Sequence, residues 1–306
     1  MPLVSSDNDF PKSLNTANKQ VKMAKKLVAE HLGSPSKRID RAQPQGMFSR
    51  TFLVTLADDP KSALGALVPR IQHYENKALE EEGAWVYCME RLLGKTWLQG
   101  ITSKGDQGRV TVSKSVGRVF AKGYLEGNST SALPLIRARL EAMIASPLQD
   151  IQPFKPQIQT HLDNLDKFAQ LPLWVSHYDL NEVNVLIDDN CEVTGLIDWE
   201  LSTPLPFGVS FGRVHTIAGE YSGGEFCMHD RFEEAERGFW DELLKGIPDA
   251  KVRRSLHDNM GTLLDCFVQE DPQNEVGCSK VTVRALPKFL TYRIPFARGD
   301  EPRYRI

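Results

Sequence analysis

The stretch LPLWVSHYDLNEVNVLIDDNCEVTGLIDWE, residues 171–200, carries the most structural information in this chain of 306 residues. Within it, two apolar runs at 184–187 and 193–197 flank the polar segment 188–191, Asp-Asp-Asn-Cys. Apolar runs with a turn-forming segment between them are typical of a β-hairpin. We therefore expect two antiparallel strands, with the turn at the centre of the polar segment.

Such a hairpin brings an amide and a carboxylate together at its open end. With the turn in that position, Asn184 faces Ile197, and Asp198 lies beside Asn184. Neighbouring side chains on paired strands have Cβ atoms about 4.5 to 8 Å apart, so the side-chain oxygens converge on one small volume. Mg²⁺ prefers oxygen ligands and often keeps waters and substrate phosphates as its remaining ligands. Asn184 and Asp198 are therefore candidate ligands of a magnesium ion that arrives with a nucleotide.

A second carboxylate, Asp179, precedes Asn184 by five residues. It needs no contact with the metal and is a candidate general base. Taken singly, each residue has a simpler interpretation: Asp179 as a turn former or helix cap, Asn184 as a turn residue, and Asp198 as an acceptor for backbone amides. The combined pattern H-x-D-L-x-x-x-N-V-L, followed fourteen residues after the asparagine by Asp198, fixes several residue types and both spacings. This combination favours a catalytic site.

The rest of the chain alternates between helical and strand-like patterns. We expect an amphipathic helix over 16–32, and a strand over 50–56 with the run 63–71 returning antiparallel to it. Residues 85–89 are predicted to form a buried strand. Further helices are expected over 75–83, from about 108, and over 135–144, 158–168, 230–245, 250–268 and 282–291. This order predicts an α+β protein in which a small β-containing part precedes a mainly helical one.

Composition limits the classes of function. The chain has 37 Lys and Arg against 40 Asp and Glu, a formal net charge of −3, and this balance argues against a nucleic-acid binder. The five cysteines include no CxxC pair, which indicates free thiols in a reducing compartment. No signal peptide and no apolar stretch of membrane-spanning length is recognisable, so we expect a cytoplasmic protein without a membrane partner. The absence of G-x-S-x-G argues against a serine hydrolase.

The motifs in residues 171–200 resemble those of a known family. The strings His177-Tyr178-Asp179-Leu180, Asn184-Val185-Leu186 and Gly195-Leu196-Ile197-Asp198-Trp199-Glu200 are similar to the catalytic loop and metal-binding motif of the aminoglycoside phosphotransferase and choline kinase superfamily. The segment Pro206-Phe207-Gly208 resembles its fungal members. This resemblance implies the bilobal protein-kinase-like fold. It also implies that Asp179 is the catalytic base, and that Asn184 and Asp198 hold Mg²⁺ on the nucleotide phosphates. His177 is expected to support the loop.

The same resemblance implies nucleotide-binding roles nearer to the N-terminus. Gly46 and Ser49, in the segment 45–52, resemble the turn that covers the ATP phosphates, although an ordinary hairpin turn is the alternative there. Arg70 takes the place of the family's usual lysine, and a guanidinium can bind phosphate through two hydrogen bonds. The backbone from Glu90 to Leu92 resembles the hinge that receives adenine.

The N-terminal lobe is short for this fold. Only residues 71–84 separate Arg70 from the hinge strand, where the family has a helix with a partner glutamate and a further strand. A single helix of that length spans about 21 Å and leaves no residues for a strand. We therefore expect an incomplete N-terminal lobe over residues 1–88 and a helical C-terminal lobe over residues 89–306. The partner glutamate is not identifiable among Glu75, Glu80, Glu81 and Glu82.

The sequence thus predicts a Mg²⁺-dependent phosphotransferase that moves the γ-phosphate of ATP, or of GTP, to a hydroxyl group of a small molecule. The alternative is a catalytically inactive, pseudokinase-like binding module, which the shortened lobe favours. The acidic residues of 220–242 are compatible with a positively charged phosphate acceptor. We interpret Glu233 to Glu242, however, as the solvated face of a helix. The acceptor and the oligomeric state stay open.

Overall fold

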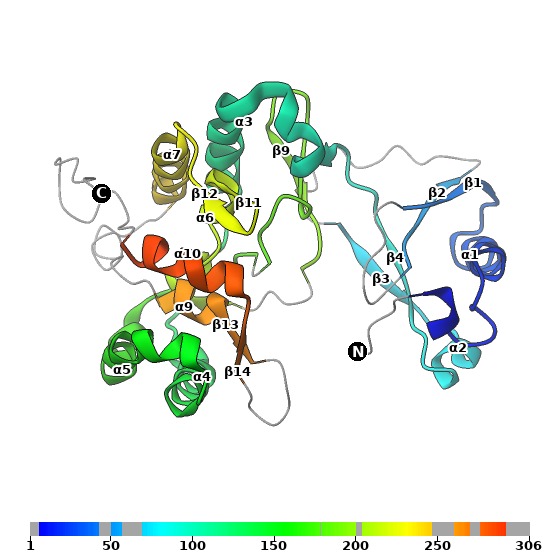
Figure 1. Ribbon diagram of the computed structural model, residues 1–306. Coiled ribbons are helices and arrows are strands. Elements are labelled where there is room, and N and C mark those ends of the chain that lie inside the picture. Colours follow the sequence, from blue (N-terminus) through cyan, green and yellow to red (C-terminus); the bar gives the residue numbers. More distant parts are fainter. Residues whose placement is uncertain are drawn as a thin grey trace. The chain divides into compact units, whose positions relative to one another are not determined.

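The computed structural model describes residues 6–42, 50–56, 69–177, 179–199, 204–246, 260–269 and 276–291. The chain divides into two compact units, Met1–Leu92 and Leu93–Ile306. Short strands and helices make up the first unit, and the second consists mainly of helices (Figure 1). This composition confirms the predicted α+β class. Among the described residues, no helix combines the length and apolar character that a membrane crossing requires.

In the first unit, a short 3-10 helix (Asp7–Asp9) precedes the predicted helix, α1 (Ala17–Leu32). Thr16 caps its N-terminus by accepting a hydrogen bond from the Lys19 amide, and Gly33 ends it with a left-handed φ of 64°. Strand β1 (Ser36–Arg41) follows and pairs antiparallel with β2 (Phe52–Leu56). The strand expected at 50–56 is therefore confirmed, but its partner is β1, which the sequence analysis missed. The expected return strand lies largely outside the described residues.

The second sheet of this unit has a short connection between its two strands. Strand β3 (Ile71–Tyr74) pairs antiparallel with β4 (Val86–Met89), and the connection between them holds the short helix α2 (Lys77–Glu81) and no other strand. The prediction that residues 85–89 are buried is wrong for one face of the strand. Trp85, Tyr87 and Met89 are 56%, 59% and 49% exposed, because alternate strand residues point to opposite faces and no described element covers this one.

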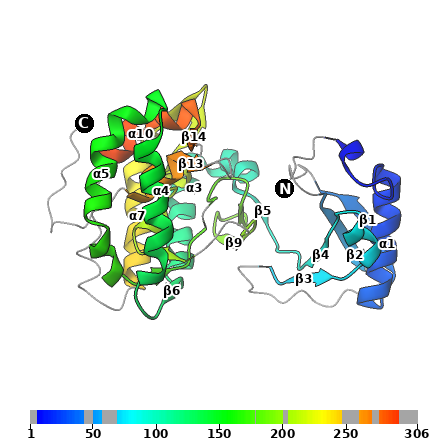
Figure 2. The same cartoon turned by 90° about the horizontal axis from the view of Figure 1, so that it is seen from below.

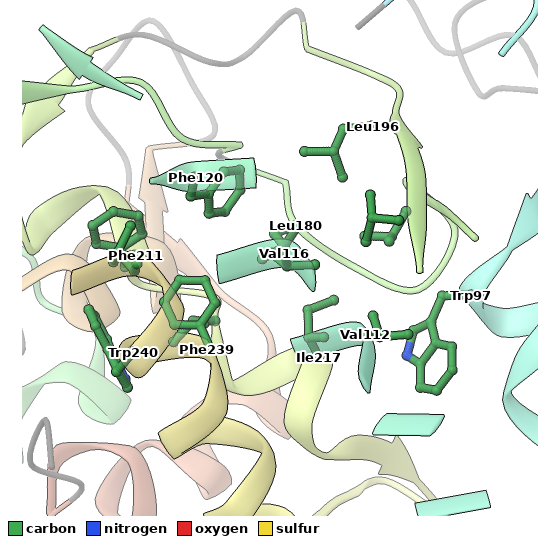
Figure 3. Close-up of a cluster of buried hydrophobic side chains, with 14 of the residues drawn as sticks. Trp97, Val112, Val116, Phe120, Leu180, Leu196, Phe211, Ile217, Phe239 and Trp240 are labelled. Atoms are coloured by element: carbon green, nitrogen blue, oxygen red, sulfur yellow. The ribbon is translucent and has the colours of Figure 1, made fainter. Parts of the chain in front are cut away.

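The second unit is organised around α3 (Trp97–Phe120) and α7 (Phe232–Lys245). Helix α3 starts eleven residues earlier than expected and is kinked at Gly105, where φ is 51°. The two helices approach closely at Gly117, since a Cβ atom there would collide with the Phe239 carbonyl oxygen. Glycine, which has no Cβ atom, permits this approach. Figure 3 shows the apolar cluster around them. It includes Trp97, Val112, Val116, Phe120, Leu180, Leu196, Phe211, Ile217, Phe239 and Trp240.

A second apolar cluster joins the remaining helices of this unit. It includes residues of α4 (Leu133–Ala145), α5 (Lys155–Asp163), α9 (Met260–Cys266) and α10 (Lys280–Thr291). Helices α4 and α5 lie side by side in both cartoons (Figure 2). The predicted C-terminal end of the helix over 250–268 is wrong. Phe267–Gln269 forms strand β13, which pairs with β14 (Val276–Cys278). Residues 247–259 lie outside the described part.

The predicted hairpin is present with the predicted register. Strands β8 (Val185–Ile187) and β9 (Val193–Leu196) pair so that Val185 faces Leu196, and the Ile197 amide donates to the Asn184 carbonyl at 3.0 Å. Strand β5 (Lys95–Thr96) completes this sheet. The remaining short elements are β6 (Tyr124–Leu125), β7 (Leu173–Trp174), β10 (Leu205–Pro206), α6 (His215–Ala218), β11 (Glu220–Ser222) and β12 (Glu225–Cys227).

Candidate active site

The loop between β7 and β8 is tied to the chain that follows β9. His177 is buried, and its Nε2 lies 2.6 Å from the carbonyl oxygen of Ile197. Its ring meets that of Trp199 edge to face, with centroids 4.9 Å apart. Burial lowers the pKa of His177, which favours the neutral ring, and a contact with a carbonyl oxygen requires the Nε2 proton. His177 therefore holds the loop against the segment that carries Asp198.

Asp179 and Asn184 are in direct contact. The Asn184 amide nitrogen donates to the Asp179 backbone carbonyl at 2.8 Å and to Oδ2 of its carboxylate at 3.1 Å. Asn181, which the sequence analysis did not single out, closes the same turn. Its side-chain oxygen accepts from the amides of Val183 at 2.9 Å and Asn184 at 3.2 Å. The candidate base and one candidate metal ligand are thus fixed on one rigid turn.

The other oxygen of the Asp179 carboxylate is paired with a residue that the sequence analysis missed. Nη1 of Arg213 donates to Oδ1 of Asp179, and Nε of the same guanidinium donates to Oδ1 of Asp265. Arg213 precedes α6, and Asp265 lies on α9. No motif in the sequence links these three positions, which are 34 and 52 residues apart along the chain.

Asp198 has an unusual backbone conformation at the end of the hairpin. Its φ is 66°, in the left-handed region that residues other than glycine adopt infrequently. The turn is held on one side by the Trp199 indole, which donates to the Leu196 carbonyl at 2.8 Å. The Asp198 side chain is exposed. Strained conformations of this kind cluster at functional sites, so this observation favours a ligand-binding role for the carboxylate.

Asn184 and Asp198 fit a magnesium ion that is shared with a nucleotide. Both donors of the Asn184 amide point to Asp179, and no described residue donates to its oxygen. The backbone pairing of Asn184 with Ile197 brings the neighbouring Asp198 to the same end of the hairpin. Within the described residues, no group of three or more His, Cys, Asp or Glu side chains is arranged to hold a metal. A pair of oxygen ligands suits Mg²⁺, which obtains the rest from phosphates and water.

The predicted nucleotide-binding residues lie in the first unit. Arg70 is exposed and immediately precedes β3, and its carbonyl accepts a hydrogen bond from the Glu90 amide at 3.1 Å. Leu92 is half-buried at the end of the unit. Gly46 and Ser49 lie outside the described residues. Among described residues no carboxylate forms an ion pair with Arg70, and Glu80 instead lies 3.4 Å from His73.

The comparison with family models identifies the wider group. A model described as "Phosphotransferase enzyme family" matches residues 62–242, more than half of the chain. The chain belongs to this family. The matched residues include the turn from Asp179 to Asn184, Asp198 and Arg213, so the candidate site lies within the phosphotransferase region. The family membership agrees with the resemblance of the motifs. The fungal affinity stays a prediction.

The comparison with solved structures finds similarity to several phosphotransferases. The apoenzyme of macrolide 2′-phosphotransferase MphH from Brachybacterium faecium is 14% identical, with a TM-score of 0.48, over 76% of this chain and 86% of that one. Choline kinase from Cryptosporidium parvum Iowa II is 13% identical, with a TM-score of 0.45, over 88% and 84%. ADP-bound aminoglycoside phosphotransferase APH(2'')-Ib is 11% identical, with a TM-score of 0.46, over 90% and 98%. No curated protein matches this chain.

Proposed function

We propose that this member of the phosphotransferase family is a Mg²⁺-dependent small-molecule kinase that transfers the γ-phosphoryl group of ATP to a hydroxyl group. GTP is the alternative donor. The observation that carries the proposal is the Asp179 carboxylate, fixed by Asn184 on one oxygen and by Arg213 on the other, while Asn184 pairs through its backbone with Ile197, the residue before Asp198. Phosphoryl transfer needs little covalent chemistry from the protein, so precise positioning of these groups is the main requirement.

Asp179 is the proposed catalytic base. Its carboxylate is one-third exposed, and each carboxylate oxygen can accept more than one hydrogen bond. An acceptor hydroxyl that donates to Asp179 would be oriented toward the phosphoryl group and would lose its proton to this side chain. Asn184, through its amide oxygen, and Asp198 are the proposed Mg²⁺ ligands. When bound, the ion supplies positive charge that neutralises the phosphates.

The nucleotide-binding roles in the first unit belong to the proposal as well. The exposed guanidinium of Arg70 is the candidate partner of the α- and β-phosphates, and the backbone from Glu90 to Leu92 is the candidate adenine site. Gly46 and Ser49 are the candidate phosphate-covering turn. The substrate class is a small molecule with a hydroxyl group, without a nucleic-acid or membrane partner. All five cysteines are present as thiols, which supports a reducing, cytoplasmic location.

Metal-dependent nucleotide binding tests the site before the acceptor is known. Isothermal titration of ATP in the presence of MgCl₂ is expected to give a binding isotherm that disappears with EDTA and in Asp198→Ala. Asp189→Ala is the matched control, because Asp189 is a highly exposed carboxylate on the turn of the same hairpin, and it is expected to bind like the parent. No binding by the parent would contradict the proposal.

A screen of hydroxyl compounds for ADP release then separates the kinase from the pseudokinase-like alternative. The alternative rests on the short connection between β3 and β4, which holds one short helix and no other strand. Substrate-dependent ADP release by the parent supports the kinase. Binding of Mg²⁺ and ATP with no ADP release in the presence of any compound would favour the binding module.

A further inference from the structure

Arg213 connects the candidate base to a buried carboxylate in another part of the unit. Its Nη1 donates to Asp179 and its Nε donates to Asp265. The Asp265 side chain is only 9% exposed, whereas those of Arg213 and Asp179 are 30% and 33% exposed. The guanidinium therefore reaches from the protein interior to the partly open side where Asp179 lies.

The backbone around Arg213 is held in place by close approach to α9. A Cβ atom at Gly212 would collide with the Gly261 carbonyl oxygen, and a Cβ atom at Gly261 would collide with the Val209 carbonyl oxygen. Asp265 lies about one helical turn after Gly261 on α9. The two glycines thus permit a backbone contact that brings Asp265 within reach of Arg213.

Further hydrogen bonds fix both ends of this connection. The Thr216 hydroxyl, on α6, donates to the Leu180 carbonyl at 2.8 Å, directly after Asp179. Nη2 of Arg139 donates to the Leu264 carbonyl at 2.6 Å, next to Asp265. The loop that carries Asp179 is therefore tied to α6, next to Arg213, and the helix that carries Asp265 is tied to Arg139.

These contacts fix the plane of the Asp179 carboxylate. Arg213 holds Oδ1 and Asn184 holds Oδ2, so rotation about the side-chain bonds would break one contact or both. Each oxygen retains acceptor capacity for a hydroxyl group. Asp265 in turn limits the movement of Arg213. Burial raises the pKa of Asp265 to about 6, and the adjacent guanidinium opposes this by favouring the ionised form.

We propose that Arg213 is a positioning residue that fixes the Asp179 carboxylate for the acceptor hydroxyl, and that Asp265 is the buried anchor of Arg213. This inference rests on the proposed kinase function. The competing explanation is that Arg213 and Asp265 only brace the fold between α6 and α9. The two explanations predict different kinetic results for a variant in which both charges are removed together.

The test compares Arg213→Met with the double variant Arg213→Met/Asp265→Asn and with Arg213→Lys. The single Met variant leaves a buried carboxylate without its partner, so we expect a lower melting temperature. The double variant removes that unpaired charge, and we expect the melting temperature to recover. If Arg213 positions Asp179, kcat for ADP release stays about 10- to 100-fold below the parent in both variants. The Kd for ATP with Mg²⁺ stays near the parental value.

Arg213→Lys is expected to recover part of kcat, because an ammonium group keeps the charge but lacks the planar geometry that serves two carboxylates at once. Arg118→Met is the matched control. Arg118 pairs with Glu192 on the surface, away from Asp179, and the variant is expected to keep the parental kcat.

The outcomes separate this inference from the function on which it rests. Recovery of both melting temperature and kcat in the double variant would show a bracing role and overturn the inference. A parental kcat in Arg213→Met would do the same while leaving the kinase function intact. A parent without any ADP release in the hydroxyl screen would overturn the kinase function, and the positioning role with it.

Discussion

Asn184 donates its side-chain amide to two different atoms of Asp179, the backbone carbonyl at 2.8 Å and the carboxylate Oδ2 at 3.1 Å. A candidate metal ligand and a candidate base are therefore coupled by direct hydrogen bonds. These bonds leave the amide oxygen of Asn184 available for a cation and hold the carboxylate of Asp179. In the proposed mechanism, binding of the metal and orientation of the base therefore depend on the same side chain.

Asn184→Ala is expected to weaken both functions of this side chain. Loss of two hydrogen bonds at a buried position lowers the free energy of unfolding by about 1 to 3 kcal/mol. Loss of the amide oxygen weakens Mg²⁺-dependent ATP binding in isothermal titration. Thermal melts in EDTA measure the first effect separately from the second. Asn190→Ala, in the exposed turn of the same hairpin, is the control, and an equal loss in that variant would contradict the assigned role.

Glu236 is expected to make stability depend on pH. This side chain is buried on α7, and burial raises its pKa to about 8 from an ordinary value of 4.5. The folded state therefore keeps the proton over a range in which the unfolded state releases it. Below pH 4.5 the side chain imposes no such penalty, and stability falls as the pH rises from 4.5 through 8, by up to about 1.4 kcal/mol per unit.

Glu236→Gln removes this dependence and keeps the size of the side chain. Urea unfolding at a series of pH values is expected to give a growing advantage of the variant over the parent between about pH 5 and 8. Exposed Glu234, on the same helix, supplies the control substitution Glu234→Gln, which is expected to follow the parent. A constant difference between Glu236→Gln and the parent across this range would show that Glu236 ionises normally.

Gly117→Ala is expected to separate α3 from α7. The added Cβ atom would collide with backbone at Phe239, and backbone cannot move aside as a side chain can. We expect a loss of about 1 to 3 kcal/mol in the free energy of unfolding, measured by denaturant titration. Gly238→Ala, on the facing helix, places its Cβ atom nearest to the side chain of Lys114, with Cγ at 2.7 Å. That variant is expected to lose less stability than Gly117→Ala, because a lysine side chain can move and alanine favours helix by about 1 kcal/mol over glycine.

Local patterns made the hairpin and part of the site predictable. The apolar runs and the turn between them define the register from Val185 to Leu196, and this register places Asn184 and Asp198 at one end. Asp179 lies close enough along the chain to share their turn. Arg213 and Asp265 were not predictable, because their contacts with each other and with Asp179 arise from packing of α6 and α9, and nothing in their local sequence distinguishes them from surface charges.

Two other predictions failed for physical reasons. Strand β1 has the sequence SKRIDR, and its many charged residues do not show the apolar pattern by which a strand is recognised, although it pairs with β2. Glu236 was assigned to a solvated face because of its charge. It lies four residues from both Phe232 and Trp240, which places it on the apolar face of α7 by helical periodicity. Periodicity predicts the buried position correctly, whereas residue type alone does not.

The most direct test of the proposed mechanism is the rate of Mg²⁺-dependent ADP release with a hydroxyl acceptor, compared between the parent and Asp179→Asn. The substitution keeps the shape of the side chain and removes its charge and proton affinity. Since a positioned base contributes about 10² to 10⁴ in rate, the mechanism predicts a loss of kcat in that range with ATP binding retained. A parental kcat in Asp179→Asn, with ADP release still dependent on the acceptor, would contradict it.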